Sequence, residues 1–199
     1  MTKPFSQACE NNKEPIRQIL ELYLQLPNTL LEIGSGTGQH GFYISEKHPQ
    51  LSWYTSDQVE NLEGIQAWVA EANRENLHKP FELNINSAQW HGAPMDIVYS
   101  ANTAHIMSWE EVIKLFQFIP VCLKPQGYFI LYGPFNYNGE FTSASNAQFN
   151  EWLKSQAAHR AIRDFEAVNE LAEQQGLMLI ADHAMPANNR TLVWQLTDS

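Results

Sequence analysis

The chain has 199 residues, of which 12 are Lys or Arg and 22 are Asp or Glu, so its formal net charge is −10. Because domains usually hold ~100 to 200 residues, this length predicts a single domain over residues 1–199. The hydrophobic content of 44% and the six Trp residues exclude a disordered chain. The acidic balance argues against a nucleic-acid partner, because surfaces that bind phosphate backbones are normally basic.

The two cysteines, Cys9 and Cys122, form no Cys-x-x-Cys motif, so nothing indicates an oxidising compartment or a structural zinc site. His-x-x-x-His spacing is absent, and we expect no metal. No window reaches the ~20 apolar residues that cross a bilayer, and the first residues lack an apolar signal core. The sequence therefore predicts a cytoplasmic protein without a membrane partner.

Short apolar, β-branched runs alternate with segments of helical period. We expect helices near residues 16–23, 62–72, 112–119 and 165–171, and strands at 29–33, 51–56, 81–85, 96–100, 128–132, 178–184 and 191–196. This order predicts a Rossmann-like, doubly wound α/β fold, a mostly parallel seven-stranded sheet with helices on both faces. Residues 186–190 are too few for a crossover helix. The last strand should therefore be antiparallel, joined to its neighbour at the turn Asn188-Asn189.

A glycine-rich loop follows the first predicted strand. A dinucleotide fingerprint would need glycine where Gln39 stands, and a Walker loop would need Lys and then Ser or Thr where the chain has Gln39-His40. The spacing Glu-x-Gly-x-Gly-x-Gly instead resembles the pattern of class I S-adenosylmethionine-dependent methyltransferases. The resemblance implies that this cofactor is bound by Glu32, Gly34, Ser35, Gly36 and Gly38. A glycine turn that merely joins strand to helix is the alternative.

Polar residues stand at or just after the ends of the next three predicted strands, at the edge where open α/β sheets bind ligands. Asp57 stands where nucleotide-binding folds carry an acidic residue for ribose hydroxyls, although Asp57 and Glu60 also match a helix capping box. Asn84 stands where methyltransferases of this class often contact adenine, although Asn is also common in turns. With Asn102, after the fourth strand, these residues complete the predicted cofactor site.

His105 follows Asn102 in a loop that should face the reaction centre, before a helix that Ser108 is expected to cap. Its ordinary pKa of ~6.5 makes it the candidate catalytic base, and the alternative is that it only hydrogen-bonds the loop. The aromatic, amide-rich loop 132–139 predicts a substrate pocket formed by Tyr132, Pro134 and Phe135. A turn held by Gly and Pro is the competing interpretation.

Residues 1–28 are predicted to form an N-terminal helical segment whose helix starts at Pro15. Two interpretations stay open for this segment. Either it closes over the cofactor as a lid, so that Asn12 belongs to the substrate pocket, or it packs on the outer face of the sheet.

Several motifs spread over nearly the whole chain together resemble the uncharacterised family of unknown function numbered 938. They are Asn12-x-x-Pro15-Ile16, the glycine loop, Ser56-Asp57, Asn102-x-x-His105-Ile106, Leu131-Tyr132-Gly133-Pro134-Phe135, Phe141-Thr142-Ser143-x-Ser145-Asn146, Ile162-Arg163-Asp164 and Met185-Pro186-Ala187-Asn188-Asn189. That family is similar to class I methyltransferases, so the resemblance implies the same fold and cofactor. One departure is Asn84-Ile85, where the family tends to have Asp-Val, which removes a charge from the adenine edge.

Together these patterns predict methyl transfer from S-adenosylmethionine to an unidentified acceptor, expected to be a small molecule. One alternative is a protein that binds S-adenosylmethionine or S-adenosylhomocysteine without catalysis. Another is a nucleotide-sugar or nicotinamide enzyme on a related sheet, against which the missing third dinucleotide glycine argues. No Ser, Cys or Thr has recognisable partners for nucleophilic hydrolysis.

Overall fold

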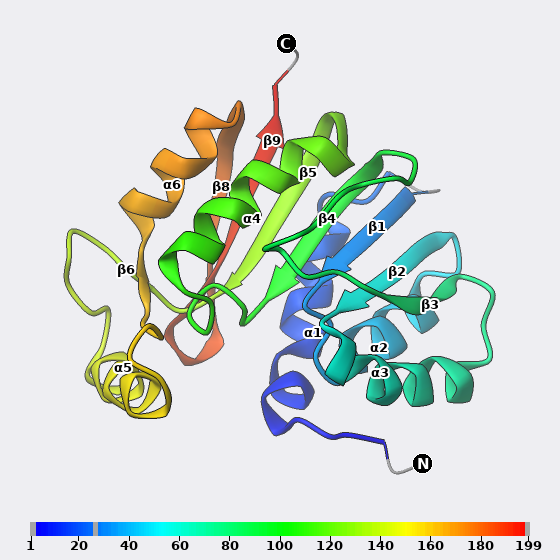
Figure 1. Cartoon of the computed structure of the whole chain (residues 1–199), viewed down its shortest axis with the longest axis horizontal. Helices are drawn as coiled ribbons and strands as arrows, with labels where there is room; N and C mark the ends of the chain where they lie inside the picture. The colour runs from blue at the N-terminus through cyan, green and yellow to red at the C-terminus, as the bar shows by residue number, and fades with distance from the viewer. Residues whose placement is uncertain (1–2, 26–27, 198–199) are drawn as a thin grey trace.

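The computed structural model describes residues 3–25 and 28–197. Seven strands form one sheet in the order β3-β2-β1-β4-β5-β9-β8 (Figure 1). Strand β9 is antiparallel to β5 and β8, and the other neighbours are parallel, which confirms the predicted fold. The strands are β1 (Asn28–Ile33), β2 (Leu51–Asp57), β3 (Leu77–Glu82), β4 (Met95–Ala101), β5 (Leu123–Gly133), β8 (Leu177–Met185) and β9 (Asn189–Leu196).

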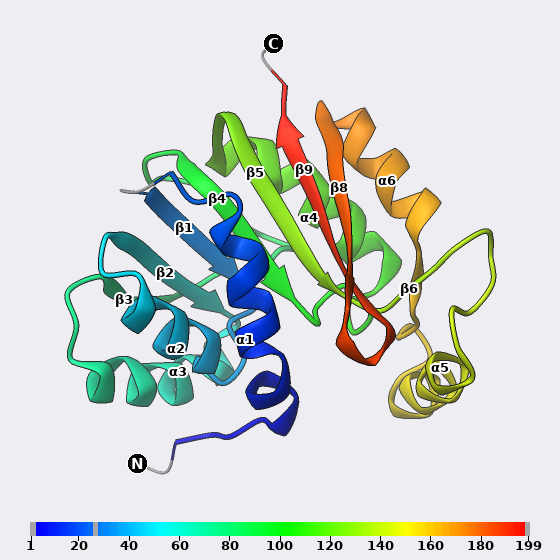
Figure 2. The same ribbon diagram turned by 180° about the vertical axis from the view of Figure 1, so that it is seen from behind.

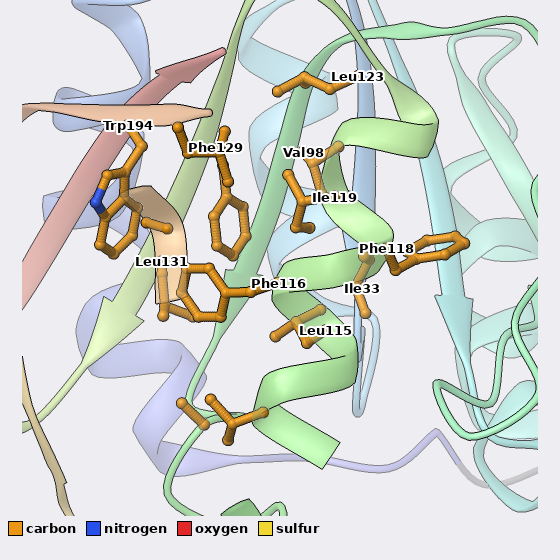
Figure 3. Packing of buried hydrophobic residues seen from close by; sticks show 14 of the residues in the cluster. Ile33, Val98, Leu115, Phe116, Phe118, Ile119, Leu123, Phe129, Leu131 and Trp194 are labelled. Atoms are coloured by element: carbon orange, nitrogen blue, oxygen red, sulfur yellow. The ribbon is translucent and has the colours of Figure 1, made fainter. Parts of the chain in front are cut away.

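Helices cover both faces of the sheet (Figures 1 and 2). One face carries α1 (Gln7–Glu21), α2 (Gln39–Lys47) and α3 (Val59–Ala72), and the other carries α4 (Trp109–Cys122) and α6 (Phe165–Gln174). The core between the sheet and helices α4 and α6 contains Phe116 of α4. Its ring packs edge-on against Phe129 of β5, with ring centroids 5.4 Å apart, and against Trp194 of β9, with centroids 5.6 Å apart (Figure 3). This aromatic cluster joins the antiparallel strand to the parallel part of the sheet.

The strand order reverses between β1 and β4. The strand that follows β1 in the chain, β2, lies on one side of the β1–β4 pair, and the strand that follows β4, β5, lies on the other side. The loop after β1 and the loop after β4 therefore lead away from each other at the carboxyl edge of the sheet. Helix α5 (Ala144–Gln156) and a small sheet of β6 (Phe135–Asn136) and β7 (Arg163–Asp164) follow β5 in the chain. In both views α5 lies at the same carboxyl edge (Figures 1 and 2). The fold therefore brings residues from most of the chain to one edge.

Three predicted boundaries are wrong. Strand β3 covers Leu77–Glu82 rather than 81–85, so Asn84 lies two residues beyond its end. Helix α1 starts at Gln7 rather than Pro15, because the Ser6 hydroxyl caps it by accepting from the Cys9 amide. The turn between β8 and β9 is the 3-10 segment Pro186–Asn188, and Asn189 is already the first residue of β9.

The cap predicted at Ser108 is confirmed. Its hydroxyl accepts from the Glu111 amide at 3.2 Å while the Glu111 carboxylate accepts from the Ser108 amide at 2.8 Å.

The predicted single domain (1–199) and N-terminal segment (1–28) include residues 1–2, 26–27 and 198–199, which lie outside the described residues. Among the helices that the structure describes, none combines the length and the apolar character that a membrane span requires.

Candidate functional site

The glycine loop between β1 and α2 holds three glycines at positive φ: 74° at Gly34, 58° at Gly36 and 88° at Gly38. A Cβ at Gly34 would lie 2.6 Å from Cγ2 of Thr103, and one at Gly38 would lie 3.2 Å from Cα of Ile65 on α3. A Cβ at Gly36 would have no atom within 4 Å. Packing inside the protein thus requires Gly34 and Gly38, whereas Gly36 leaves its backbone open to a ligand.

Asp57, the last residue of β2, joins the glycine loop to the start of α3. Its Oδ2 accepts from the amide of Gly36 at 2.6 Å, and its Oδ1 accepts from the amide of Gln58 at 2.7 Å and the side chain of Asn61 at 2.8 Å. The alternative capping box with Glu60 is wrong, because Gln58 is the cap residue and makes no side-chain cap bond. Since a carboxylate has about four acceptor positions, Asp57 keeps one for a ligand.

Glu32 in the glycine motif points into the protein. It is 1% exposed, accepts from Nε1 of Trp53 at 2.9 Å, and lies 3.7 Å from Nδ1 of His40. The other imidazole nitrogen of His40, Nε2, lies 2.8 Å from Oδ1 of Asn12 on α1. Ser35 is also internal, because its hydroxyl accepts from the Ser56 amide. These side chains hold the loop and α1 in place rather than facing a ligand.

His40 belongs to this network, although no sequence motif marks it as a site residue. Burial lowers its pKa, but hydrogen bonds and charges from Cys9 and Glu32 outweigh burial and raise the pKa to about 9. The imidazole is therefore protonated near neutral pH and also meets the Tyr99 hydroxyl at 3.2 Å. The only sequence signal is that His40 directly follows the glycine loop.

The end of β4 lies against the ends of β1 and β5. The hydroxyl of Ser100 donates to the carbonyl of Ile33 at 2.7 Å, and the amide of Asn102 donates to the carbonyl of Tyr132 at 2.8 Å. Asn102 has a φ of 58° and is half-buried. Asn84 lies beyond β3, where its Oδ1 accepts from the Asn86 amide in a local turn.

His105 is 6% exposed and lies at the end of β5, where its Nδ1 is 3.7 Å from the position of a Cβ on Gly133. Its ring packs edge-on against Phe149 of α5, with centroids 5.4 Å apart. The loop is held through the main chain, because the His105 carbonyl accepts from the amide of Ala161 at 3.1 Å.

Burial and two arginines from the segment after α5 together set the pKa of His105. Burial, and then the positive charges of Arg163 and Arg160, lower the pKa of His105 to about 4, so the imidazole is neutral at neutral pH. Arg163 also donates to the carbonyls of Ala104 at 3.0 Å and of Met107, which fixes the loop that carries His105. A neutral imidazole is able to accept a proton.

The predicted substrate residues separate into two groups. Tyr132 is buried on the face that carries α1, and its hydroxyl accepts from Nδ2 of Asn189 at 3.0 Å, whereas Asn12 of α1 contacts His40. Phe135 is 1% exposed and packs in the core on the face of the sheet opposite to Tyr132, so the structure does not bring these two predicted pocket residues together.

Two cavities bear on the site. One of about 390 Å³ lies beside Asn189, between the β8–β9 turn and the segment after β6, and is lined by Tyr137, Thr142, Ala184, Met185, Asn188, Asn189 and Arg190. Another of about 680 Å³ lies under loop 83–94, and Asn84 is the one predicted site residue that lines it. No group of three or more His, Cys, Asp or Glu in the described residues is arranged to hold a metal.

Residues 3–196 match a family described as "Protein of unknown function (DUF938)". The chain belongs to this family. Among solved structures, it is similar to an O-methyltransferase family protein from Burkholderia thailandensis, with 16% identity, a TM-score of 0.83, and coverage of 96% of this chain and 58% of that one. It is also similar to human N-acetylserotonin methyltransferase in complex with SAM, with 12% identity, a TM-score of 0.81, and coverage of 96% and 53%.

A third similar structure is an O-methyltransferase family 2 protein from Planctomyces limnophilus in complex with apigenin. It shares 13% identity and a TM-score of 0.75, over 86% of this chain and 52% of that one. At these identities the similarity shows the fold, which this family member shares with methyltransferases. The chain spans a little more than half the length of these solved chains.

Proposed function

We propose that this protein is an S-adenosylmethionine-dependent methyltransferase that acts on a small-molecule acceptor. The observation that carries the proposal is the open backbone at Gly36, bonded to the carboxylate of Asp57 at the point where the strand order reverses. The similarity of the fold to methyltransferases, one of them in complex with SAM, supports this choice of cofactor.

The residues at this edge fit a nucleoside with a ribose diol. Asp57 has one acceptor position left on Oδ2 for a hydroxyl, and a second hydroxyl fits if the exposed Asn61 side chain moves away from Oδ1. When bound, the cofactor supplies a sulfonium methyl group. The protein has to align the acceptor in line with that group at ~3 to 3.5 Å and to exclude water.

His105 is the proposed proton acceptor where the accepting atom carries a hydrogen. Its imidazole is neutral and lies at the end of β5, and Arg163 fixes the surrounding loop. The cavity beside Asn189 is the proposed acceptor side, because Asn189 lines it and donates to the hydroxyl of Tyr132 in β5. The apigenin complex of a similar structure supports a small-molecule acceptor of this kind.

Calorimetry with S-adenosylmethionine and S-adenosylhomocysteine tests the cofactor site. We expect micromolar binding, equivalent to roughly 8 kcal/mol, that falls at least tenfold in Gly36→Val. Gly139→Val is the matched control, because Gly139 also has positive φ and open space around a Cβ. Undetectable binding of both ligands at millimolar concentration to the folded wild-type chain would overturn the proposal.

Turnover separates the enzyme from a protein that binds the cofactor without catalysis. The assay follows label from S-adenosylmethionine into a small-molecule extract, with wild type and His105→Gln side by side. Labelled product that declines in His105→Gln supports the proposed base. Cofactor binding without any labelled product, across extracts from several sources, would favour the binding protein.

A further inference from the structure

The connection from β3 to β4 leaves part of the sheet without a helix above it. Residues 83–94, all of which the structure describes, pass from the sheet edge to β4 as irregular chain on the face that carries α4 (Figure 1). A crossover between parallel strands normally contains a helix, whose side chains cover the strands below it. Here the cavity of about 680 Å³ lies between loop 83–94 and the strands.

The floor of this cavity comes from four adjacent strands. Thr29 of β1, Tyr54 of β2, Phe81 of β3 and Met95 of β4 each contribute a lining side chain. Tyr54, Phe81 and Met95 also belong to the core on the α4 side or pack against it. The remaining lining residues are Glu82 and those of the loop itself, so the cavity is enclosed between sheet and loop.

Two of the aromatic lining residues are held in place by their neighbours. The ring of Tyr54 stacks on His78 of β3, with centroids 4.0 Å apart and planes 8° from parallel. The indole of Trp90 packs edge-on against Phe118 of α4 at 6.5 Å, and a Cβ on Gly92 would lie 2.8 Å from its Cζ2. The aromatic walls are therefore formed before any ligand arrives, as is usual for small-molecule sites.

Asn86 ties the roof of the cavity to α4. Its Nδ2 donates to Oε1 of Glu111 at 2.9 Å, and its Oδ1 accepts from Nζ of Lys114 at 2.7 Å. Both partners lie on the helix that packs against the same face of the sheet. The loop is thus anchored at its middle, and the space below it is part of the folded structure.

The charges around the cavity favour a ligand without negative charge. Glu82 is the one carboxylate among the residues that line it, and none of those residues is Lys or Arg. An anion would meet repulsion there and no compensating cation. The roof instead offers the neutral side chains of Asn84, Ser87 and Gln89, which can both donate and accept hydrogen bonds.

The cavity extends away from the candidate cofactor site. Asn84 lies near the carboxyl edge, but Thr29 stands five residues before Gly34 in β1, which is about 16 Å at the rise of an extended strand. Met95 is likewise the first residue of β4. Methyl transfer as described above uses none of the aromatic residues of this cavity.

We propose that the cavity under loop 83–94 is a second ligand site, which takes an uncharged, planar aromatic molecule with hydrogen-bonding groups on its rim. The rings of Tyr54, Phe81 and Trp90 supply apolar contact, and the amide and hydroxyl groups of the roof supply the polar contacts. The volume lies within the range of ~300 to 1,000 Å³ that is common for small-molecule sites. This inference goes beyond the proposed function and does not depend on it.

Methionine methyl signals in NMR spectra of the full-length chain test the site. The chain has five Met residues; Met95 lines this cavity and Met185 lines the one beside Asn189, so one spectrum reports on both. The probe is prodan, an uncharged naphthalene with a ketone and a dimethylamino group, and Met95→Leu assigns the signal. We expect prodan to move the Met95 signal saturably, with one molecule bound per chain. A Met95 signal that stays in place, or that moves no more than that of Met185, would overturn the site.

A variant that fills the cavity locates the probe independently. Ala88 is a half-buried lining residue, and Ala88→Trp should weaken prodan binding at least tenfold. Ala70→Trp, at an exposed position of α3, is the matched control and should bind as wild type does. Circular dichroism checks both folds. If Ala88→Trp does not fold, Ser87→Trp at an exposed lining position decides, and full affinity in the folded variant contradicts the proposal.

Two further titrations test the charge and the separateness of the site. The prodan analogue in which a carboxylate replaces the ketone should bind at least fivefold more weakly than prodan, and Glu82→Gln should narrow that difference. Equal affinity of the two probes for wild type would overturn the assigned ligand class. Saturating S-adenosylhomocysteine should leave the affinity for prodan unchanged. Competitive displacement would mean that the probe occupies the cofactor edge, and a second site would then be excluded.

Discussion

The amide of Gly36 donates to the carboxylate of Asp57 at 2.6 Å, across 21 residues of sequence and between the first and second strands. This bond fixes the one glycine of the loop that faces open space. Because the same carboxylate also accepts from the first turn of α3, its conformation couples the loop to that helix. The acidic residue thus shapes the candidate cofactor site even before it contacts a ligand.

Removal of the Asp57 carboxylate should weaken cofactor binding more than it weakens the fold. Asp57→Ala loses three accepted hydrogen bonds, and we expect at least a tenfold loss of S-adenosylhomocysteine affinity, about 1.4 kcal/mol or more. The matched control is Asp164→Ala, because Asp164 also ends a strand before a helix but its side chain makes no cap bond. An equal loss of affinity in both variants would remove Asp57 from the site.

Asn61→Ala should have the opposite effect. It frees an acceptor position on Oδ1 of Asp57, so cofactor affinity should stay equal or rise a few-fold in the same calorimetric titration. A tenfold fall would mean that Asn61 itself contacts the ligand.

Gly34→Ala should destabilise the fold by about 2 to 4 kcal/mol, since it combines positive φ with a Cβ 2.6 Å from Cγ2 of Thr103. Urea unfolding measures the loss. The partner change Thr103→Ser removes Cγ2 while keeping the hydroxyl that bonds to Ser100, so the double variant should recover about half of the loss. If the losses of unfolding free energy in the two single variants simply add in the double variant, the contact with Cγ2 of Thr103 does not cause the destabilisation by Gly34→Ala.

The fold could be predicted from the sequence because most strands are continuous apolar runs bounded by turns. Strand β3 was misplaced because it lies at the sheet edge and buries only Leu77, whereas Leu83 and Ile85 are buried beyond its end. Helix α5 was missed for a related reason. Two of its three buried residues, Asn146 and Asn150, are polar, so it has no apolar stripe to reveal a helical period.

The site was partly predictable for a different reason. Glycine spacing and a polar residue at a strand end are local signals, and the structure brings the loop and Asp57 together at the carboxyl edge that they indicate. The contacts of His40 with Asn12, Glu32 and Tyr99 join segments far apart in the chain, and no periodicity marks them. Phe135 looked like a pocket residue because aromatic residues suit both pockets and cores.

The lowered pKa of His105 should make the protein less stable in acid. The folded-state pKa of about 4 lies below the unfolded value of ~6.5, so the stability is fully present above pH ~6.5 and is lost as the pH falls towards 4. The loss should reach at most about 3 kcal/mol in urea unfolding. His105→Gln should flatten this part of the profile, whereas His91→Gln, at an exposed histidine, should leave it unchanged.

Arg160→Gln offers a second measurement on the same imidazole. It removes one of the two positive charges that lower the pKa of His105, so an NMR titration of the ring protons should show that pKa rising by a fraction of a unit or more. Lys154→Gln, in the preceding helix, is the control. An unchanged His105 titration in Arg160→Gln would mean that burial and Arg163 account for the whole effect.

The raised pKa of His40 predicts a loss of stability on the alkaline side. Its folded-state pKa of about 9 lies above the unfolded value of ~6.5, so the contribution is fully present below pH ~6.5 and is lost as the pH rises through 9. NMR should find the imidazole still charged at pH 7.5, and urea unfolding should show the stability falling between pH 7 and 9. A ring that titrates near 6.5 would contradict a contact with Glu32 that holds the proton.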